Sequence, residues 1–235
     1  IAAGEAVKLA KINNLTVIVT DHHAIPFTTV EAGKNSEDVS GQYPQEADTE
    51  RGSFDFYKDG NIYHLPHADC VVDPHRADDT YQFPGICGAV VAFKLISELF
   101  EMADRTDAMR YLPEAAFATV TDIMELKDEN RAIVSLGLKQ LSQSENIGLD
   151  KLIAVTGLDK NNIKAWQIGF VLGPCFNASG RIDSAEKALR LLLETDEEKA
   201  EQEALELVSL NEQRKAMEQQ GIDVALETLS HAESL

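Results

Sequence analysis

The chain has 235 residues, of which 44% are hydrophobic and 26% are charged, a balance typical of a globular protein with a buried core. Since no apolar run reaches the roughly 18 residues that a membrane-spanning helix needs, we expect no membrane-spanning segment. The net charge of −19 disfavours a passive nucleic-acid binder, because such a surface repels phosphate, and it favours a metal-dependent enzyme in which divalent cations reverse the sign locally.

The three cysteines, Cys70, Cys87 and Cys175, are odd in number and too widely spaced for a metal-binding pair. This usage predicts a reduced protein of the cytoplasm, with cysteines that act as small buried hydrophobic residues. The chain opens at Ile1 without an initiator methionine or a basic targeting segment, and its first residues continue a helical pattern. We therefore expect a fragment of a longer protein.

The first two predicted elements are a helix and a strand. Residues 1–12 mix apolar and charged side chains as the end of a helix does, and Asn13-Asn14 breaks the pattern. Residues 15–20 are almost all apolar, which is typical of a parallel strand buried on both faces. The order of helix, short turn and strand predicts an α/β fold with a parallel sheet flanked by helices.

The chain between residues 27 and 65 is polar and has turn signals at residues 33–36 and 58–61, so we expect an excursion with at most a hairpin. A short strand is predicted at residues 69–72. Shorter helices are then predicted at residues 87–102, 113–120, 131–141, 148–155, 162–168 and 184–192.

A long helix is predicted over residues 196–229, which are rich in Glu, Lys, Gln and Ala. Its composition differs from that of the preceding chain, so we place a boundary near residue 195. Residues 1–195 then form the α/β part, and residues 196–235 form a helix that connects to a second domain.

The strongest candidate site is Asp21-His22-His23, which directly follows the apolar strand. Ligands of open α/β sheets bind beyond the carboxyl ends of the strands, where these side chains are expected. One imidazole suits a metal ion, and the other can contact or protonate a phosphate oxygen. The alternative is a polar loop that contains two histidines by chance.

A second candidate is Asp122, an acid in the largely apolar segment of residues 118–126. A carboxylate in such a segment is costly unless it is paired or bound to a metal ion. The alternative is a helix N-cap, a position that favours Asp.

Two glycine-containing segments are candidates for phosphate binding. Gly85 and Gly88 precede an apolar helix, whose first N–H groups and dipole attract anions, although tight packing against the sheet explains these glycines equally well. Residues 173–181 are interpreted as a turn-rich loop that presents Asn177 and Arg181 to a phosphate or a sugar. The alternative is a surface loop whose arginine pairs with an acid.

Three other positions are weaker candidates. His75 and Arg76 follow the strand of residues 69–72, where they would border the same crevice. Trp166 is the only tryptophan, and its helical spacing among apolar residues favours packing in the core over base stacking.

Taken in order, these segments resemble the motifs of the DHH phosphoesterase family and, in particular, of its RecJ-like exonucleases. Asp21-His22-His23 is similar to the motif that names the family. The other similar segments are residues 69–76, 85–89, 121–126 with 129–131, 177–181 and 210–214. The resemblance covers nearly the whole chain, is weakest across residues 31–65, and implies a DHH-type parallel sheet followed by a helical segment and a long connecting helix.

The resemblance also implies a role for each matched residue. His22 and Asp122 would bind one Mn²⁺ or Mg²⁺ ion of a two-metal site, and His23 would contact the scissile phosphate. Asp21 would orient the two histidines. The residues expected to hold phosphate or the nucleic-acid backbone are Asn177, Arg181, Gly88, His75 and Arg76.

The implied activity is metal-dependent 5′–3′ hydrolysis of single-stranded DNA in repair and recombination. In the parent protein the implied partners are single-stranded nucleic acid and a helicase or single-strand-binding protein. Earlier aspartate motifs of the family are not in this sequence, so residues 1–195 would be a partial catalytic domain. We expect the chain by itself to bind metal poorly and to be inactive.

Two other interpretations stay open from the sequence. The first is another DHH phosphoesterase: a nano-RNase, a cyclic-dinucleotide phosphodiesterase or an inorganic pyrophosphatase. The second is a non-catalytic interaction module, in which the acidic tail of residues 194–233 docks a basic partner.

Overall fold

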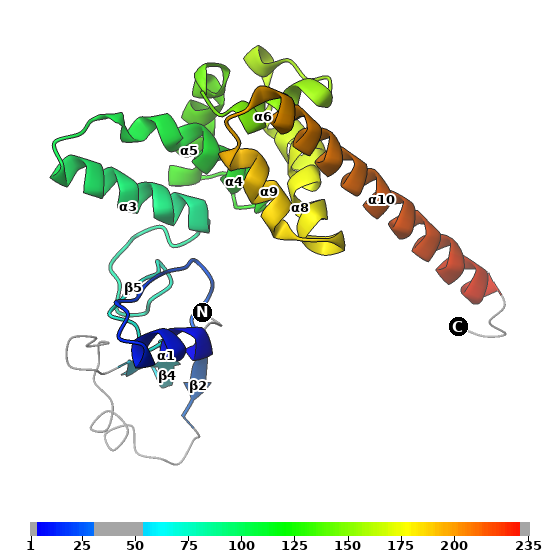
Figure 1. The fold of residues 1–235 in the computed structure, drawn as a ribbon. Coiled ribbons are helices and arrows are strands. Elements are labelled where there is room, and N and C mark those ends of the chain that lie inside the picture. Colours follow the sequence, from blue (N-terminus) through cyan, green and yellow to red (C-terminus); the bar gives the residue numbers. More distant parts are fainter. Residues whose placement is uncertain (1–3, 31–53, 231–235) are drawn as a thin grey trace. The chain divides into compact units, whose positions relative to one another are not determined.

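A computed structural model describes residues 4–30 and 54–230 of the chain (Figure 1). The chain divides into two compact units. Unit 1 comprises residues 1–109 and 124–130, and unit 2 comprises residues 110–123 and 131–235. The fold is mixed α/β and rich in helices, and the strands among the described residues all belong to unit 1.

The described residues of unit 1 form a small parallel sheet, an antiparallel sheet and the helices α1 and α3. Its elements are α1 (Gly4–Ile12), β1 (Ile18–Thr20), β2 (Phe27–Thr29), β3 (Asp55–Lys58), β4 (Asn61–His64), β5 (Cys70–Val72) and α3 (Gly88–Met102). The predicted helix at residues 1–12 is confirmed from Gly4 on, and residues 1–3 lie outside the described residues. The predicted helix at residues 87–102 and the predicted strand at residues 69–72 are confirmed, each beginning one residue later. Helix α3 contacts β1, which brings the start of the helix to the parallel sheet.

Strands β1 and β5 pair in parallel, with Thr20 opposite Val72. The prediction of a parallel strand at residues 15–20 is confirmed for Ile18–Thr20, but the expected burial on both faces is wrong, because Ile18 is 62% exposed. The reason is that β5 is the one strand paired with β1 in the part of the chain that the structure describes. A two-stranded sheet covers too little of each strand to bury both faces.

The second sheet is antiparallel, with the strand order β2-β4-β3. The predicted turn at residues 58–61 is confirmed as the turn between β3 and β4, where Asp59 and Gly60 both have positive φ. The expectation of at most a hairpin is wrong, because β2 adds a third strand to it. Phe56 is completely buried and stacks on Tyr63, which gives this sheet its own apolar face. The predicted turn at residues 33–36 lies outside the described residues.

The regular elements among the described residues of unit 2 are all helical, and η1 and α5 begin in unit 1. The elements are η1 (Asp107–Tyr111), α4 (Leu112–Thr121), α5 (Asp128–Gln140), η2 (Leu141–Gln143), α6 (Ile147–Val155), η3 (Lys160–Asn162), α7 (Ala165–Gln167), η4 (Ile168–Leu172), α8 (Gly173–Ile182), α9 (Ala185–Leu193) and α10 (Glu197–Ser230). The predicted helices at residues 113–120, 131–141, 148–155, 184–192 and 196–229 are confirmed. The predicted helix at 162–168 is instead a short 3-10 turn followed by α7 and the one-turn π-helix η4.

The core of unit 2 lies where α6, α8, α9 and α10 meet. Leu152, Leu172 and Leu191 are completely buried there. Helices α6 and α9 approach very closely at Gly148, where an added Cβ would lie 1.7 Å from the Leu191 carbonyl oxygen. Only a residue without a side chain fits at this crossing.

Two sequence-based expectations for this region are wrong. Residues 173–181 are not a turn-rich loop but most of helix α8. Pro174 is tolerated because it lies in the first turn of this helix, and Gly173 allows close packing, since an added Cβ would lie 2.6 Å from Thr121 Cγ2. Trp166 is not in the core, because its position on α7 leaves it 59% exposed.

Helix α10 packs into unit 2 with its first half and extends beyond the other helices of the unit with its second half (Figure 1). Ala200, Ala204 and Leu207 are buried at helical spacing, whereas residues 215–230 are exposed. That this second half connects to another domain, with a boundary near residue 195, stays a prediction. Among the described residues, no helix is both long and apolar enough to cross a membrane.

Candidate metal centre

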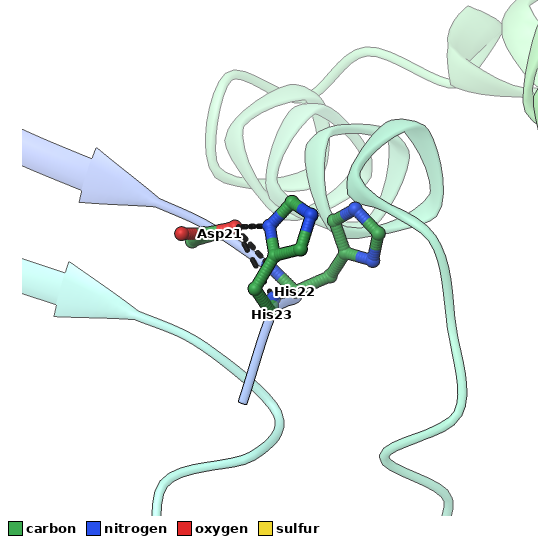
Figure 2. Close-up of side chains that lie close together, drawn as sticks. All are labelled: Asp21, His22 and His23. Carbon is green, nitrogen blue, oxygen red and sulfur yellow. Dashed lines mark hydrogen bonds and ion pairs between the residues drawn. The ribbon is translucent and has the colours of Figure 1, made fainter. Parts of the chain in front are cut away.

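The polar residues that follow β1 form a compact cluster (Figure 2). Asp21, His22 and His23 each offer one ligand atom, and these three atoms lie within 4.8 Å of one another. No other set of three His, Cys, Asp or Glu residues within residues 4–30 and 54–230 meets this spacing. Asp21 and His22 are partly buried and His23 is exposed, so the cluster lies at the edge of unit 1 with access to solvent.

Asp21 organises the cluster. One of its oxygens, Oδ1, accepts hydrogen bonds from the backbone N–H groups of His22 (2.7 Å) and His23 (3.2 Å) and from the His23 ring at Nδ1 (2.7 Å). Burial raises the pKa of Asp21, but the bonds from His23 and from the two backbone N–H groups outweigh burial and hold the pKa well below its usual range. The carboxylate therefore stays ionised, and the proton on Nδ1 directs Nε2 of His23 away from it.

His22 packs against the start of α3. An added Cβ on Gly88 would lie 3.2 Å from Cδ2 and 3.7 Å from Nε2 of the His22 imidazole. Glycine at position 88 therefore allows the helix to approach the ring on one side. The His23 ring lies on another side, with its centroid 4.3 Å from that of His22. This packing fixes the orientation of His22, while the predicted contact of Gly88 with phosphate stays a prediction.

Asp73 was not singled out from the sequence, although it lies beside the predicted site. Because Thr20 pairs with Val72, Asp21 and Asp73 directly follow the ends of two neighbouring parallel strands. Asp73 is 1% exposed. Burial raises its pKa, and the negative charge of Asp21 acts in the same direction.

The Asp73 carboxylate is arranged like that of Asp21. Its Oδ1 accepts a hydrogen bond from the backbone N–H of His75 (2.8 Å) and lies 3.7 Å from His75 Nδ1. Its Oδ2 has no hydrogen-bond partner among the described residues. The sequence signal that could have found this residue is the repeated Asp-x-His pattern after two strands, at Asp21-x-His23 and Asp73-x-His75.

The Arg76 side chain forms hydrogen bonds within unit 1. Its guanidinium donates to the Val71 carbonyl oxygen (2.9 Å) and forms two hydrogen bonds to the carboxylate of Asp78 (3.0 and 2.6 Å). These bonds connect β5 to the turn that follows it. A contact of Arg76 with nucleic acid therefore stays a prediction that this arrangement does not favour.

Asn130 connects the start of α3 to the segment after α4. Its side chain is completely buried and donates to the carbonyl oxygens of Gly85 (2.7 Å) and Glu125 (3.0 Å). The neighbouring Glu129 accepts hydrogen bonds from Lys94 and Tyr81. These contacts hold the loop that leads to Gly88, and so they support the position of His22.

Asp122 is exposed and forms the C-cap of α4, not an N-cap. Its backbone N–H donates to the Ala118 carbonyl oxygen (2.9 Å), and the next residue, Ile123, has positive φ and is 90% exposed. The Asp122 carboxylate is therefore not buried, so the expected cost of placing it in an apolar segment does not arise. Asp122 belongs to unit 2 and His22 to unit 1. Their ligation of one ion stays a prediction.

Asn177 and Arg181 lie on α8 at a spacing of four residues, which places them on the same side of the helix. Both residues are exposed. Within residues 4–30 and 54–230 neither side chain has a hydrogen-bond or ion-pair partner, so the alternative of an arginine paired with a nearby acid is wrong for this part of the chain.

The sequence is similar to known bacterial exonucleases. It is 34% identical over 228 residues to the single-stranded-DNA-specific exonuclease RecJ of Bacillus subtilis. This alignment covers 97% of this chain and 24% of that protein. It is 36% identical over 154 residues to the enzyme of the same name from Thermus thermophilus, covering 66% of this chain and 22% of that protein. The chain thus spans about a quarter of the length of these relatives. No protein-family model matches the chain.

The fold is similar to two solved structures that contain manganese. RecJ of Thermus thermophilus in complex with Mn²⁺ matches with a TM-score of 0.70 and 28% identity over 97% of this chain and 28% of that one. A second structure, of exonuclease RecJ bound to manganese, matches with a TM-score of 0.72 and 28% identity over 96% of this chain and 48% of that one.

Proposed function

Because the chain is homologous to the RecJ single-strand-specific exonucleases and matches RecJ in structure, we propose that it supplies part of the active site of a metal-dependent exonuclease that hydrolyses single-stranded DNA. The observation that carries this proposal is the cluster of Asp21, His22 and His23 at the carboxyl end of β1. The homology favours this function over the other DHH phosphoesterases and over a non-catalytic module.

The donor atoms of the cluster fit a divalent cation. Asp21 stays ionised, and the buried Asp73 Oδ2 beside this strand end has no partner among the described residues. Imidazole and carboxylate ligands suit Mn²⁺, and carboxylate oxygens suit Mg²⁺. When bound, such an ion supplies the positive charge that draws a phosphate to this acidic protein. We assign His22 as a ligand and Asp122 as the ligand that unit 2 contributes.

Asp21 and His23 act on the phosphate side of the site. The Asp21 carboxylate holds Nδ1–H of His23, which leaves Nε2 of the 72% exposed ring to contact a phosphate oxygen. Asp21 thereby orients His23 and, through the backbone N–H of His22, the turn that carries both histidines. On unit 2, Asn177 and Arg181 hold the nucleic-acid backbone, with Arg181 supplying the charge.

The remaining features of the function belong to the same proposal. The parent protein would act in the cytoplasm, in repair and recombination, alongside a helicase or a single-strand-binding protein. Residues 1–195 would be a partial catalytic domain and residues 196–235 a helix that connects it to a second domain. The chain by itself would bind metal poorly and would be inactive.

A chimera tests this function. The chain replaces the matched 228-residue segment of the Bacillus subtilis relative, and release of nucleotides from a 5′-labelled single strand is measured with Mn²⁺. We expect the chimera to be active and the His22→Ala and Asp122→Ala variants to lose at least about a hundredfold of that activity, since each removes a metal ligand. Leu189→Ala, a change at an exposed residue outside the site, is the matched control.

Three results would contradict the proposal. The first is an inactive chimera that is folded, as judged by circular dichroism and its melting temperature. The second is full activity of the His22→Ala variant. In a substrate panel, the dinucleotide pApA could be hydrolysed much faster than long single strands, which would indicate a nano-RNase instead.

A further inference from the structure

The segment from Lys160 to Ile182 differs in charge from the rest of the chain. The whole chain has 40 acidic and 21 basic residues, yet this segment has no acidic residue and three basic ones: Lys160, Lys164 and Arg181. Lys160 is paired with Asp150 at 2.7 Å, so Lys164 and Arg181 supply the positive charge of this stretch. In a protein with a net charge of −19, a stretch without acids repels phosphate less than the acid-rich remainder does.

Exposed and partly exposed residues of this segment recur along one side of the continuous helical run of α7, η4 and α8. Trp166, Phe170, Pro174, Asn177 and Arg181 follow one another at spacings of three or four residues, which keeps side chains on one face of a helix. Trp166 is 59% exposed and Phe170 is 81% exposed. The opposite side supplies Ile168, Leu172, Cys175 and Ala178 to the core of unit 2.

Large aromatic side chains are not normally left on the surface in this way. Phe170 lies in the π-helical turn η4, which inserts an extra residue per turn and is a feature often found at functional sites. Its exposure is not a defect of packing, because its neighbours Ile168 and Leu172 are completely buried. The fold therefore exposes Trp166 and Phe170 on a helical run whose opposite side packs into the core of unit 2.

We propose that Trp166 and Phe170 form a base-stacking surface for single-stranded nucleic acid that continues from Asn177 and Arg181. This inference rests on the proposed function, since it extends the backbone contact assigned to Asn177 and Arg181. Binding of a single strand combines cationic contacts to the backbone with stacking of bases on aromatic rings, and this stripe presents both. From Trp166 to Arg181 the helix rises about 22 Å, enough to follow several nucleotides.

Nucleic acid fits this surface better than a protein partner does. An unpaired arginine and an unpaired asparagine amide beside two aromatic rings match a phosphate and a base. A protein that recognised this chain by charge would be basic, and it would bind the acid-rich remainder of the chain instead of this stripe.

The test uses Trp166 as an intrinsic reporter, because it is the only tryptophan of the chain. The 235-residue chain is titrated with an oligo(dT) strand of about 12 nucleotides, within the range that single-strand-binding folds cover. Tryptophan emission and the anisotropy of the labelled strand are both recorded. An abasic strand of equal length reports the contribution of the backbone alone.

We expect oligo(dT) to quench Trp166 emission along the same curve as the anisotropy. Phe170→Ala and Trp166→Ala are expected to weaken oligo(dT) binding about 5- to 100-fold, the effect of losing one stacked base, and to change binding of the abasic strand less than twofold. Arg181→Ala is expected to weaken binding of both strands. Trp166→Phe is expected to retain binding. Leu189→Ala, at a residue of α9 that is 55% exposed, is expected to change the binding of neither strand.

Several results would overturn the inference. If Arg181→Ala weakens binding while Phe170→Ala and Trp166→Ala do not, the stacking surface is wrong and the proposed function stands. If the chain binds neither strand, the surface is also wrong, and the proposed function is judged separately by the His22→Ala chimera. If polyglutamate competes as well as oligo(dT) does, the stripe binds an acidic polypeptide instead.

Discussion

Gly88→Ala separates the geometry of the metal centre from the stability of the fold. The added Cβ would lie 3.2 Å from Cδ2 of His22, whereas carbon atoms in ordinary contact are about 3.5–4.0 Å apart. The imidazole would therefore move by roughly 0.3–0.8 Å, more than the tolerance of about 0.2 Å on a metal–ligand distance. We expect the affinity for Mn²⁺ to fall about tenfold, at the lower end of the effects of changing residues that orient a ligand.

The same substitution is expected to leave the free energy of unfolding unchanged or to raise it. Gly88 is the first residue of α3, and alanine is favoured over glycine in a helix by at most about 1 kcal/mol. Paramagnetic broadening by Mn²⁺ of the ring resonances of His23, whose centroid lies 4.3 Å from that of His22, measures affinity in every variant, even where binding is weak. Urea unfolding measures stability.

Gly221→Ala is the matched control, because this glycine also lies in a helix and an added Cβ there meets nothing within 4 Å. It should leave Mn²⁺ binding unchanged. The reasoning would be refuted if Gly88→Ala binds Mn²⁺ as the parent chain does while His22→Ala binds it much more weakly. If His22→Ala also binds as the parent chain does, His22 is not a ligand.

Three further predictions concern residues that shape the two units. Gly148→Ala should lower the free energy of unfolding of unit 2 by at least about 3 kcal/mol in urea, because the new Cβ would overlap the Leu191 carbonyl oxygen. A decrease of less than about 1 kcal/mol would show that α6 and α9 separate easily. Asn130→Ala should lower the free energy of unfolding by about 2–4 kcal/mol, since it leaves the Gly85 and Glu125 carbonyl oxygens without this donor. It should also weaken Mn²⁺ binding. Normal Mn²⁺ binding in a destabilised variant would limit Asn130 to a structural role. Glu114→Gln should stabilise the chain at pH 7 and not at pH 4. Burial raises the pKa of Glu114 in the folded state, so the folded chain releases this proton less readily than the unfolded chain does. The folded state therefore loses stability as the pH rises above the pKa of the unfolded state, and glutamine removes this loss. Melting temperatures across this pH range would contradict the last prediction if the gain were equal at both ends.

Elements whose signals are local could be predicted from the sequence. Helix α9 begins where Ser184 caps the N–H of Glu186, and α10 begins after Asp196, whose carboxylate accepts from the N–H of Lys199. The turn at Asp59-Gly60 follows from residues that tolerate positive φ. The cluster of Asp21, His22 and His23 could also be predicted, because three adjacent residues after a strand lie close together in any fold.

Features that depend on contacts between residues distant in sequence could not be predicted in this way. The pairing of Thr20 with Val72 places Asp73 beside Asp21, and no local pattern reports the register between two strands. Gly173 and Pro174 carried turn signals, yet close packing on Thr121 and a place in the first helical turn make them part of α8. Trp166 had core spacing, yet the core side of its helix is taken by Ile168 and Leu172, so the ring remains at the surface. Burial is a property of what surrounds a residue, and the surroundings come from segments that the local sequence does not contain.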